Sequence, residues 1–235
     1  MRRHLRLSLA LLVLSLAPAS ATTISGSVNY SSESIGAFGS WSIGFTASHP
    51  GVLLQVVTID LGPTGLFFDT AAGAPGFLLW QDFQPTGGTD IATGFSGVNL
   101  PLGLVPDGST LLALAFNAFT PAAGPFTFLL DVDGPANYAG CPTGFLGALC
   151  RAGRNLDASL VTSDEIQGAL VTMDFWVPEH GNFQVDTTLG VSGDFTADGG
   201  FEATATPEPG TWALLGAGLA ALVLRRRLAA SANPE

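Results

Sequence analysis

The sequence predicts an all-β fold, an antiparallel β-sandwich of about 9–11 strands, and two observations support this prediction. Apolar and polar residues alternate over short segments, most clearly in Phe126–Asp133, where every second residue from Phe126 to Val132 is apolar. Turn-forming clusters such as Gly62-Pro63-Thr64-Gly65 separate these segments. Many short alternating segments between such turns are typical of a sandwich.

The expected strands follow one another along the chain. They are Ile24–Tyr30, Trp41–Ala47, Val52–Leu61, Phe77–Phe83, Phe95–Leu100, Leu111–Phe116, Phe126–Asp133, Val171–Val177, Phe183–Leu189 and Phe195–Ala203. In Val171–Val177 the odd-numbered residues are apolar, whereas Thr172 and Asp174 are expected to face outward. Only residues 157–168 carry capping residues that favour a helical turn.

The N-terminus has the three parts of a secretory signal peptide. Arg2, Arg3 and Arg6 precede the apolar run Leu7–Leu16, and Ala19-Ser20-Ala21 supplies the small residues that signal peptidase requires. We expect residues 1–21 to be removed, residues 22–203 to form one β-sandwich domain, and residues 204–228 to form a separate tail. An N-terminal membrane anchor is disfavoured because the apolar run is short.

The charge of the mature segment limits its partners. The chain has no lysine, and residues 22–206 hold 17 acidic residues against Arg151 and Arg154, a formal net charge of −15. Such a surface repels nucleic acid and anionic lipid, whose binding depends on Lys and Arg. It favours solubility and attracts divalent cations.

The C-terminal tail combines a rigid tripeptide, an apolar segment and a basic cluster. Pro207-Glu208-Pro209 favours an extended, exposed chain, and Arg225, Arg226 and Arg227 favour the cytoplasmic side of a membrane. Between them lie the apolar residues expected in the membrane, Trp212, Leu214, Leu215, Leu219, Leu222 and Leu224. The 14 residues 211–224 span roughly 21 Å as a helix, short of the roughly 30 Å hydrocarbon core. This length favours a short or transient membrane anchor.

In this order the three parts resemble the PEP-CTERM sorting signal of Gram-negative bacteria that make exopolysaccharide. The resemblance covers about residues 205–228 and implies recognition by exosortase, a membrane protease, near Pro207-Glu208-Pro209. It also implies export across the inner membrane, retention by the tail, and then display at the cell surface or in the extracellular matrix. The chain differs from the usual pattern in the extension 228–235. A plain single-span anchor is the alternative. More loosely, residues 107–176 resemble β-sandwich modules of exported bacterial surface proteins.

Cys141 and Cys150 are the only two cysteines. In an exported protein an even pair at close spacing predicts a disulfide. The pair has neither the C-x-x-C spacing of a redox motif nor the neighbouring ligands of a metal site.

Asp131 and Asp133 are the best candidates for a metal site. Their spacing of two puts both carboxylates on one face at the end of a strand, and Ca²⁺ prefers several oxygens at one place. Asp157, Asp164 or Glu165 would complete the set. The alternative is that the two are turn and edge-strand residues that oppose aggregation. Apart from this possible calcium, no cofactor is expected.

No catalytic constellation is evident, and we expect a protein without enzymatic activity. His49 and His180 lie in turn-like contexts, and Gly94-Phe95-Ser96-Gly97 lacks the G-x-S-x-G spacing of a nucleophile elbow. The favoured function is a structural or adhesive component of an exopolysaccharide matrix. The second is a carbohydrate-binding module that uses an exposed Trp176, and the third is a hydrolase with paired carboxylates.

Overall fold

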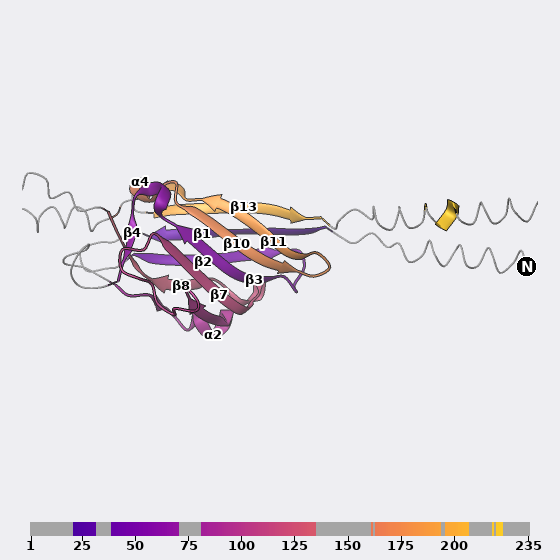
Figure 1. Ribbon diagram of the computed structural model, residues 1–235, viewed down its shortest axis with the longest axis horizontal. Coiled ribbons are helices and arrows are strands. Elements are labelled where there is room, and N and C mark those ends of the chain that lie inside the picture. The colour runs from indigo at the N-terminus through magenta and orange to yellow at the C-terminus, as the bar shows by residue number, and fades with distance from the viewer. Residues whose placement is uncertain are drawn as a thin grey trace, which may run out of the picture. The chain divides into compact units, whose positions relative to one another are not determined.

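The computed structural model describes residues 21–31, 39–70, 81–134, 161, 163–193, 196–206, 218 and 220–222. The chain divides into two units, Thr22–Thr204 and a second unit of Met1–Ala21 with Ala205–Glu235. The unit Thr22–Thr204 contains three β-sheets (Figure 1).

The larger sheet has six strands in the order β12-β13-β1-β2-β8-β5. Their bounds are β1 Thr22–Ser31, β2 Ser40–Ala47, β5 Gln84–Pro85, β8 Phe126–Leu129, β12 Gly190–Gly193 and β13 Thr196–Ala205. The pairs β1–β2, β2–β8, β5–β8 and β12–β13 are antiparallel. In β1, Ile24, Val28 and Tyr30 are fully buried, as the period of two along a strand requires.

The second sheet has five strands in the order β11-β10-β3-β7-β6, all antiparallel to their neighbours. The bounds are β3 Leu53–Asp60, β6 Phe95–Val98, β7 Leu111–Phe119, β10 Leu170–Val177 and β11 Gly181–Thr188. Along β10, Val171, Met173, Phe175 and Val177 are fully buried. Thr172 and Asp174 are partly exposed, which confirms the alternation predicted for this strand.

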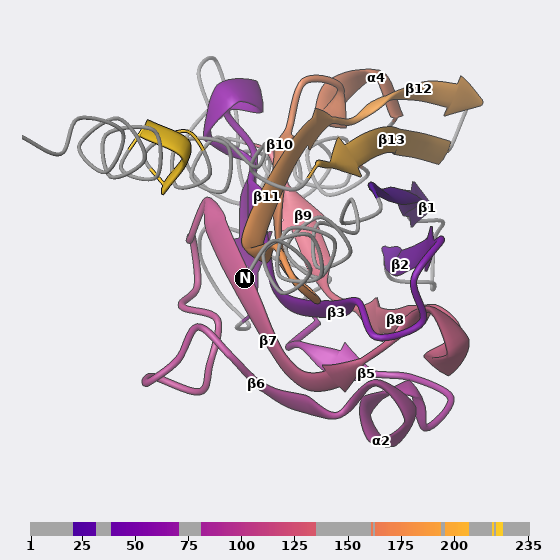
Figure 2. The same cartoon turned by 90° about the vertical axis from the view of Figure 1, so that its right-hand side faces the viewer.

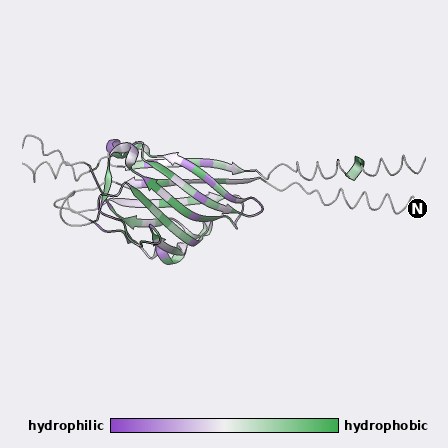
Figure 3. Cartoon of the chain, in the orientation of Figure 1, coloured by the Kyte–Doolittle hydropathy of each residue, from purple (hydrophilic) through white to green (hydrophobic). Residues whose placement is uncertain are grey.

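Side chains from the two sheets meet in one aromatic core. The ring of Phe45 on β2 lies 5.4 Å from that of Phe119 on β7 and 5.2 Å from that of Phe175 on β10, centroid to centroid. The ring of Phe126 on β8 packs at 5.0 Å against that of Phe116 on β7. These contacts across the sheets show two layers packed face to face, which is the architecture of a sandwich (Figure 2). Apolar and polar residues alternate along the strands (Figure 3).

A third sheet pairs β4 (Phe67–Asp69) with β9 (Asp131–Asp133). Short helices complete the described part of the unit: η1 Gly62–Thr64, α2 Thr89–Thr93, η2 Pro121–Ala123 and α4 Ser163–Ile166. The helix α4 lies within the segment 157–168 where a helical turn is predicted, whereas the helix α2 is not predicted from the sequence. Left-handed glycines, Gly88 with φ 71° and Gly94 with φ 62°, flank α2 at its two ends.

The fold is all-β and antiparallel as predicted, but the described residues form 13 strands where about 9–11 are expected. The expected strand Phe126–Asp133 is divided, because its first half pairs with β2 and its second half pairs with β4. Two of the additional strands, β4 and β5, have only three and two residues. Most of the expected strand Phe77–Phe83 lies outside the described residues.

Candidate metal centre

The strands β4 and β9 bring three aspartates onto one face of a short ladder. Their register pairs Asp69 directly with Asp131, Phe68 with Val132, and Phe67 with Asp133. Because successive side chains of a strand point to opposite faces, Asp69, Asp131 and Asp133 share a face. On the opposite face, Phe68 and Val132 are fully buried.

The opposite face of β4 is fixed by packing. The ring of Phe68 lies 6.4 Å from that of Trp41, which stacks on Phe128 at 5.9 Å. Burial of the aromatic side chains of Phe68 and Trp41 stabilises the folded state by several kcal/mol. This packing leaves the side chain of Asp69 on the opposite face of the ladder, the face that it shares with Asp131 and Asp133.

Residues 105–109 hold the second edge of β4. The amide of Phe68 donates to the carbonyl of Ser109 at 2.8 Å, and that of Gly108 donates to the carbonyl of Phe68 at 2.9 Å. The amide of Thr70 donates to Oδ1 of Asp107 at 3.1 Å, and its hydroxyl donates to the carbonyl of Val105 at 3.0 Å. Three segments, distant in sequence, therefore converge at the aspartates.

The three carboxylates are close together and buried. One ligand oxygen from each of Asp69, Asp131 and Asp133 lies within 4.8 Å of the others. Asp69 and Asp131 are 0% exposed and Asp133 is 2% exposed. Aspartates are seldom fully buried unless they are paired or coordinate a metal.

Asp133 has unfavourable surroundings for a negative charge. Burial above all, then a hydrogen bond shared with Asp69 and the charges of Asp131, Asp69 and Asp107, together raise its pKa from the ordinary 3.8 to about 9. Apart from Asp69, no described residue donates an N–H or O–H to either oxygen of Asp133. The hydrogen bond with Asp69 therefore needs a proton on one of the two carboxyls. Chemically, the cluster suits shared protons or an oxygen-seeking cation.

The predicted metal residues are thus brought together, but with a different third partner. Asp131 and Asp133 share a face, as their spacing predicts. The residue that joins them is Asp69, which the sequence reasoning missed. Asp164 and Glu165 are exposed on α4, and Asp157 lies outside the described residues. Both carboxylates are buried, which disfavours the alternative that they are turn and edge-strand residues opposing aggregation.

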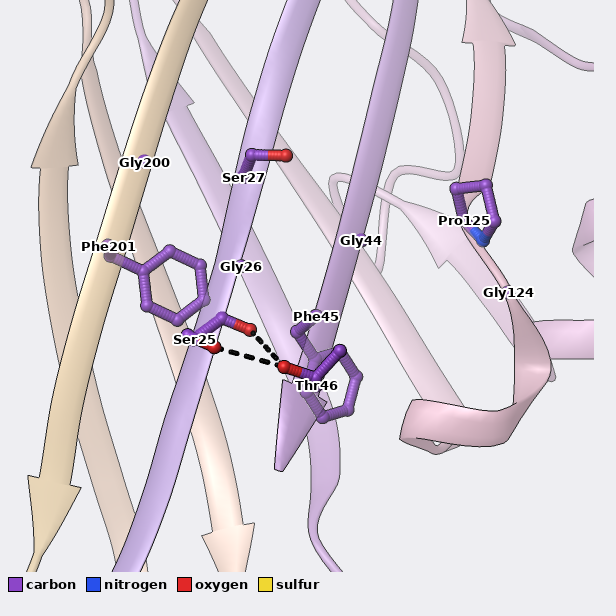
Figure 4. A pocket seen from close by; sticks show the side chains of 10 residues that line it. All are labelled: Ser25, Gly26, Ser27, Gly44, Phe45, Thr46, Gly124, Pro125, Gly200 and Phe201. Carbon is purple, nitrogen blue, oxygen red and sulfur yellow. Dashed lines mark hydrogen bonds between the residues drawn. The ribbon is translucent and has the colours of Figure 1, made fainter. Parts of the chain in front are cut away.

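A shallow groove crosses the six-stranded sheet, with a volume of about 490 Å³ (Figure 4). Its described lining consists of glycines, short hydroxyl residues, Pro125 and two phenylalanines, without a titratable side chain. Oγ of Ser25 and Oγ1 of Thr46 are hydrogen-bonded at 3.0 Å. The ring of Phe201 lies where a side chain on Gly26 would reach, 2.8 Å from the position of such a Cβ. The described lining of the groove offers no group for acid–base chemistry.

The other residues that the sequence offers for catalysis or binding are not part of the aspartate cluster. His49 is exposed in a turn, where its Nδ1 accepts from the amide of Gly51 at 3.0 Å. Ser96 lies within strand β6, not at a strand-to-helix elbow. Trp176 is 40% exposed on β10, as predicted, with Asn182 of β11 and Leu53 of β3 at the paired positions.

The C-terminal segment lies almost wholly outside the described residues. Of the predicted membrane residues only Leu222 is described, and it is helical and exposed. Among the residues that the structure describes, no helix has both the length and the apolar character needed to cross a membrane. The other predicted positions outside the described residues are the signal peptide 1–20, Cys141, Cys150, the Pro207-Glu208-Pro209 tripeptide and Arg225–Arg227.

Comparison with protein families settles what this tail is. Residues 205–227 match the PEP-CTERM protein-sorting motif. The chain carries a PEP-CTERM sorting signal. This finding confirms the resemblance seen in the sequence, and it supports an exported protein that is processed by exosortase. No curated protein and no solved structure matches the chain.

The motif begins where the last strand ends. β13 runs to Ala205, and the PEP-CTERM match starts at that residue. The sorting signal therefore follows the β-sandwich directly, without an intervening linker between strand and signal.

Proposed function

We propose that this protein is a non-enzymatic component of the cell envelope, delivered by its PEP-CTERM signal and acting as a structural or adhesive element of an exopolysaccharide matrix. The observation that carries the proposal is the sorting motif at 205–227, directly behind a sandwich that ends at β13. Signal peptidase would remove residues 1–21, and exosortase would act near Pro207-Glu208-Pro209. The net charge of −15 keeps such a domain soluble between anionic polymers.

The arrangement of the carboxylates argues against the hydrolase alternative. Glycosidases use two carboxyl groups roughly 5–10 Å apart that face the substrate. Asp69, Asp131 and Asp133 are closer together and almost inaccessible to solvent. The groove on the six-stranded sheet offers no carboxylate in its described lining.

The sorting step is tested by intact mass in the native host. We expect the species recovered from the surface and the culture supernatant to end near Pro207-Glu208-Pro209, without Arg225–Arg227. Replacing the three residues Pro207, Glu208 and Pro209 by alanine should keep the chain in the membrane at full tail length. Deletion of residues 229–235, beyond the motif, is the matched control and should leave processing unchanged. A surface species that retains Arg225–Arg227 would contradict the proposal.

The structural role is tested by the cohesion of the matrix. Cells that lack the protein should release more polysaccharide under shear than wild-type cells, and the alanine variant of the sorting tripeptide should behave like the deletion. Equal release from all three strains would contradict a structural or adhesive role and leave only the sorting assignment.

A second candidate, carbohydrate binding, is favoured by the outer face of the five-stranded sheet. Trp176 is exposed there beside Asn182, and Asp174 is paired with Gln184. An exposed indole next to amide groups suits stacking and hydrogen bonding to a sugar. Trp176→Ala should abolish retardation of the protein in gels that contain the host polysaccharide. Leu170→Ala, an exposed residue of the same strand, is the control, and equal retardation of both variants would contradict this candidate.

A further inference from the structure

We propose that Asp69, Asp131 and Asp133 bind one Ca²⁺ ion, which links β4 to β9 and stabilises the exported domain. The sorting signal at residues 205–227 supplies none of these three ligands. Failure of the calcium site would therefore leave the proposed function untouched.

The separation of the oxygens fits the size of the ion. Oxygens bind Ca²⁺ at about 2.3–2.6 Å, so two ligands on opposite sides of one ion lie up to about 5 Å apart. The three aspartates offer oxygens within 4.8 Å of one another. Mg²⁺ holds its ligands at about 2.0–2.1 Å and would require a tighter set.

The ligand chemistry also selects the ion. Three carboxylates without a neighbouring thiol or imidazole in the described cluster suit a hard cation and disfavour zinc or copper. Each carboxylate can bind through one or both oxygens, so the three supply between three and six of the six to eight oxygens that Ca²⁺ takes. Asp107 adds negative charge beside Asp133.

The state of Asp133 provides an observation independent of the clustering. Its side chain is 98% buried, and apart from the carboxyl of Asp69 no group among the described residues is in place to donate to either oxygen. An ionised carboxylate in such a place is strongly unfavourable unless a cation or a donor offsets the lost hydration. The described residues include no lysine and no arginine, so the protein there supplies no permanent positive charge.

The location of the ligands explains what the ion would do. Asp69 and Asp131 are far apart in sequence, and the ladder that joins β4 to β9 is only three residues long. So short a ladder is weak by itself. One cation between the strands adds bonds on the face opposite Phe68 and Val132. Extracellular calcium modules typically bind with Kd of about 10⁻⁴–10⁻³ M, which is a suitable range for an exported protein.

The experiment uses the full-length chain purified in detergent. Thermal unfolding is followed by circular dichroism in EDTA, in 10 mM CaCl₂ and in 10 mM MgCl₂, and binding is measured by titration calorimetry with CaCl₂. For a Kd of about 0.1 mM, Ca²⁺ should raise Tm by roughly 5–10 °C, with one ion bound per chain. Mg²⁺ should give a much smaller shift.

The variants locate the site. Asp133→Asn and, separately, Asp131→Asn preserve side-chain volume and should lose both the Tm shift and the calorimetric signal. The double change Asp164→Asn with Glu165→Gln, which alters exposed carboxylates, should respond as the wild type does.

The main alternative to a bound Ca²⁺ ion is neutralisation of the aspartates by the two arginines of the mature segment. Arg151 and Arg154 lie outside the described residues and could neutralise the aspartates in place of an ion. In the double variant Arg151→Gln with Arg154→Gln the response to Ca²⁺ should persist. Equal Tm in Ca²⁺ and EDTA for the wild type, or an unchanged response in Asp133→Asn, would overturn the proposal.

Discussion

Replacing Asp133 by asparagine should stabilise the metal-free protein although it destroys the proposed calcium site. The folded chain holds the pKa of Asp133 at about 9, whereas the ordinary value is 3.8. At pH 7 and without metal, Asp133 therefore carries a proton when folded and loses it on unfolding. Asparagine has nearly the same shape as a protonated aspartate and needs no proton.

The magnitude follows from the ionisation of the unfolded chain. Since pH 7 lies about 3.2 above 3.8 and each pH unit corresponds to about 1.36 kcal/mol, protonating this carboxyl costs about 4 kcal/mol. This is a ceiling for the gain from Asp133→Asn, because the three carboxyls share their protons. At 2–4 °C per kcal/mol, half of that ceiling corresponds to a rise in Tm of roughly 4–8 °C.

The dependence on pH has a definite sign. A carboxyl whose pKa is raised on folding binds more protons in the folded state, so the free energy of unfolding falls as pH rises. In EDTA the wild type should therefore lose stability steadily from about pH 4 to about pH 9. Asp133→Asn should show a much flatter profile, and the two should converge near pH 4.

The assay is a series of thermal melts in EDTA from pH 4 to pH 9, repeated in 10 mM CaCl₂ at pH 7. In EDTA Asp133→Asn should melt higher than the wild type, and in Ca²⁺ the order should reverse. Asp164→Asn, an exposed carboxylate on α4, is the control and should follow the wild type. If Asp133→Asn melts lower than the wild type in EDTA at pH 7, then Asp133 makes a favourable interaction as an anion and the reasoning is refuted.

Two further predictions concern the core and the cysteines. Phe68→Ala should lower the free energy of unfolding by about 3–5 kcal/mol and also weaken Ca²⁺ binding, since Phe68 is fully buried on the face of β4 opposite Asp69. Denaturant titrations measure the first effect and calorimetry the second. Leu100→Ala, at an exposed position, is the control and should change neither quantity. Cys141 and Cys150 should form a disulfide, which stabilises the folded state by about 2.5 kcal/mol through the lower chain entropy of the unfolded state. Alkylation of the exported protein without reduction should therefore label neither cysteine. Labelling of both would contradict the prediction.

The sequence predicts the sandwich because its longer strands repeat with a period of two. On β10 the four apolar residues of Val171–Val177 all face the core, and the register with β3 and β11 keeps that face continuous. The strands β4 and β5 are too short to show a period, so only their pairing in the folded chain reveals them. The short helix α2 depends on the glycines at its two ends more than on an apolar repeat.

Two of the three aspartates of the candidate site are predicted from the sequence, whereas the third depends on tertiary structure. The spacing of Asp131 and Asp133 predicts a shared face, which the register confirms. Their burial is not predictable from that spacing, because it arises where the chain leaves one sheet after Leu129 and joins β4 in another. Asp69 has no local pattern that distinguishes it from a turn residue, since its role depends on a partner strand distant in sequence.

The acidic composition of the mature segment bears on its interior as well as on its surface. With 17 acidic residues and two arginines in the mature segment, most carboxylates can remain hydrated at the surface, where their repulsion is weak. Asp69, Asp131 and Asp133 cannot, because the packing of Phe68 and Val132 fixes the ladder that holds them inside. Without a cation, Asp133 must hold a proton at pH 7, because its pKa is raised. If the proposed Ca²⁺ ion binds, the same three charges link the two strands. The proposed ion would therefore strengthen the ladder wherever the exported domain meets divalent cations.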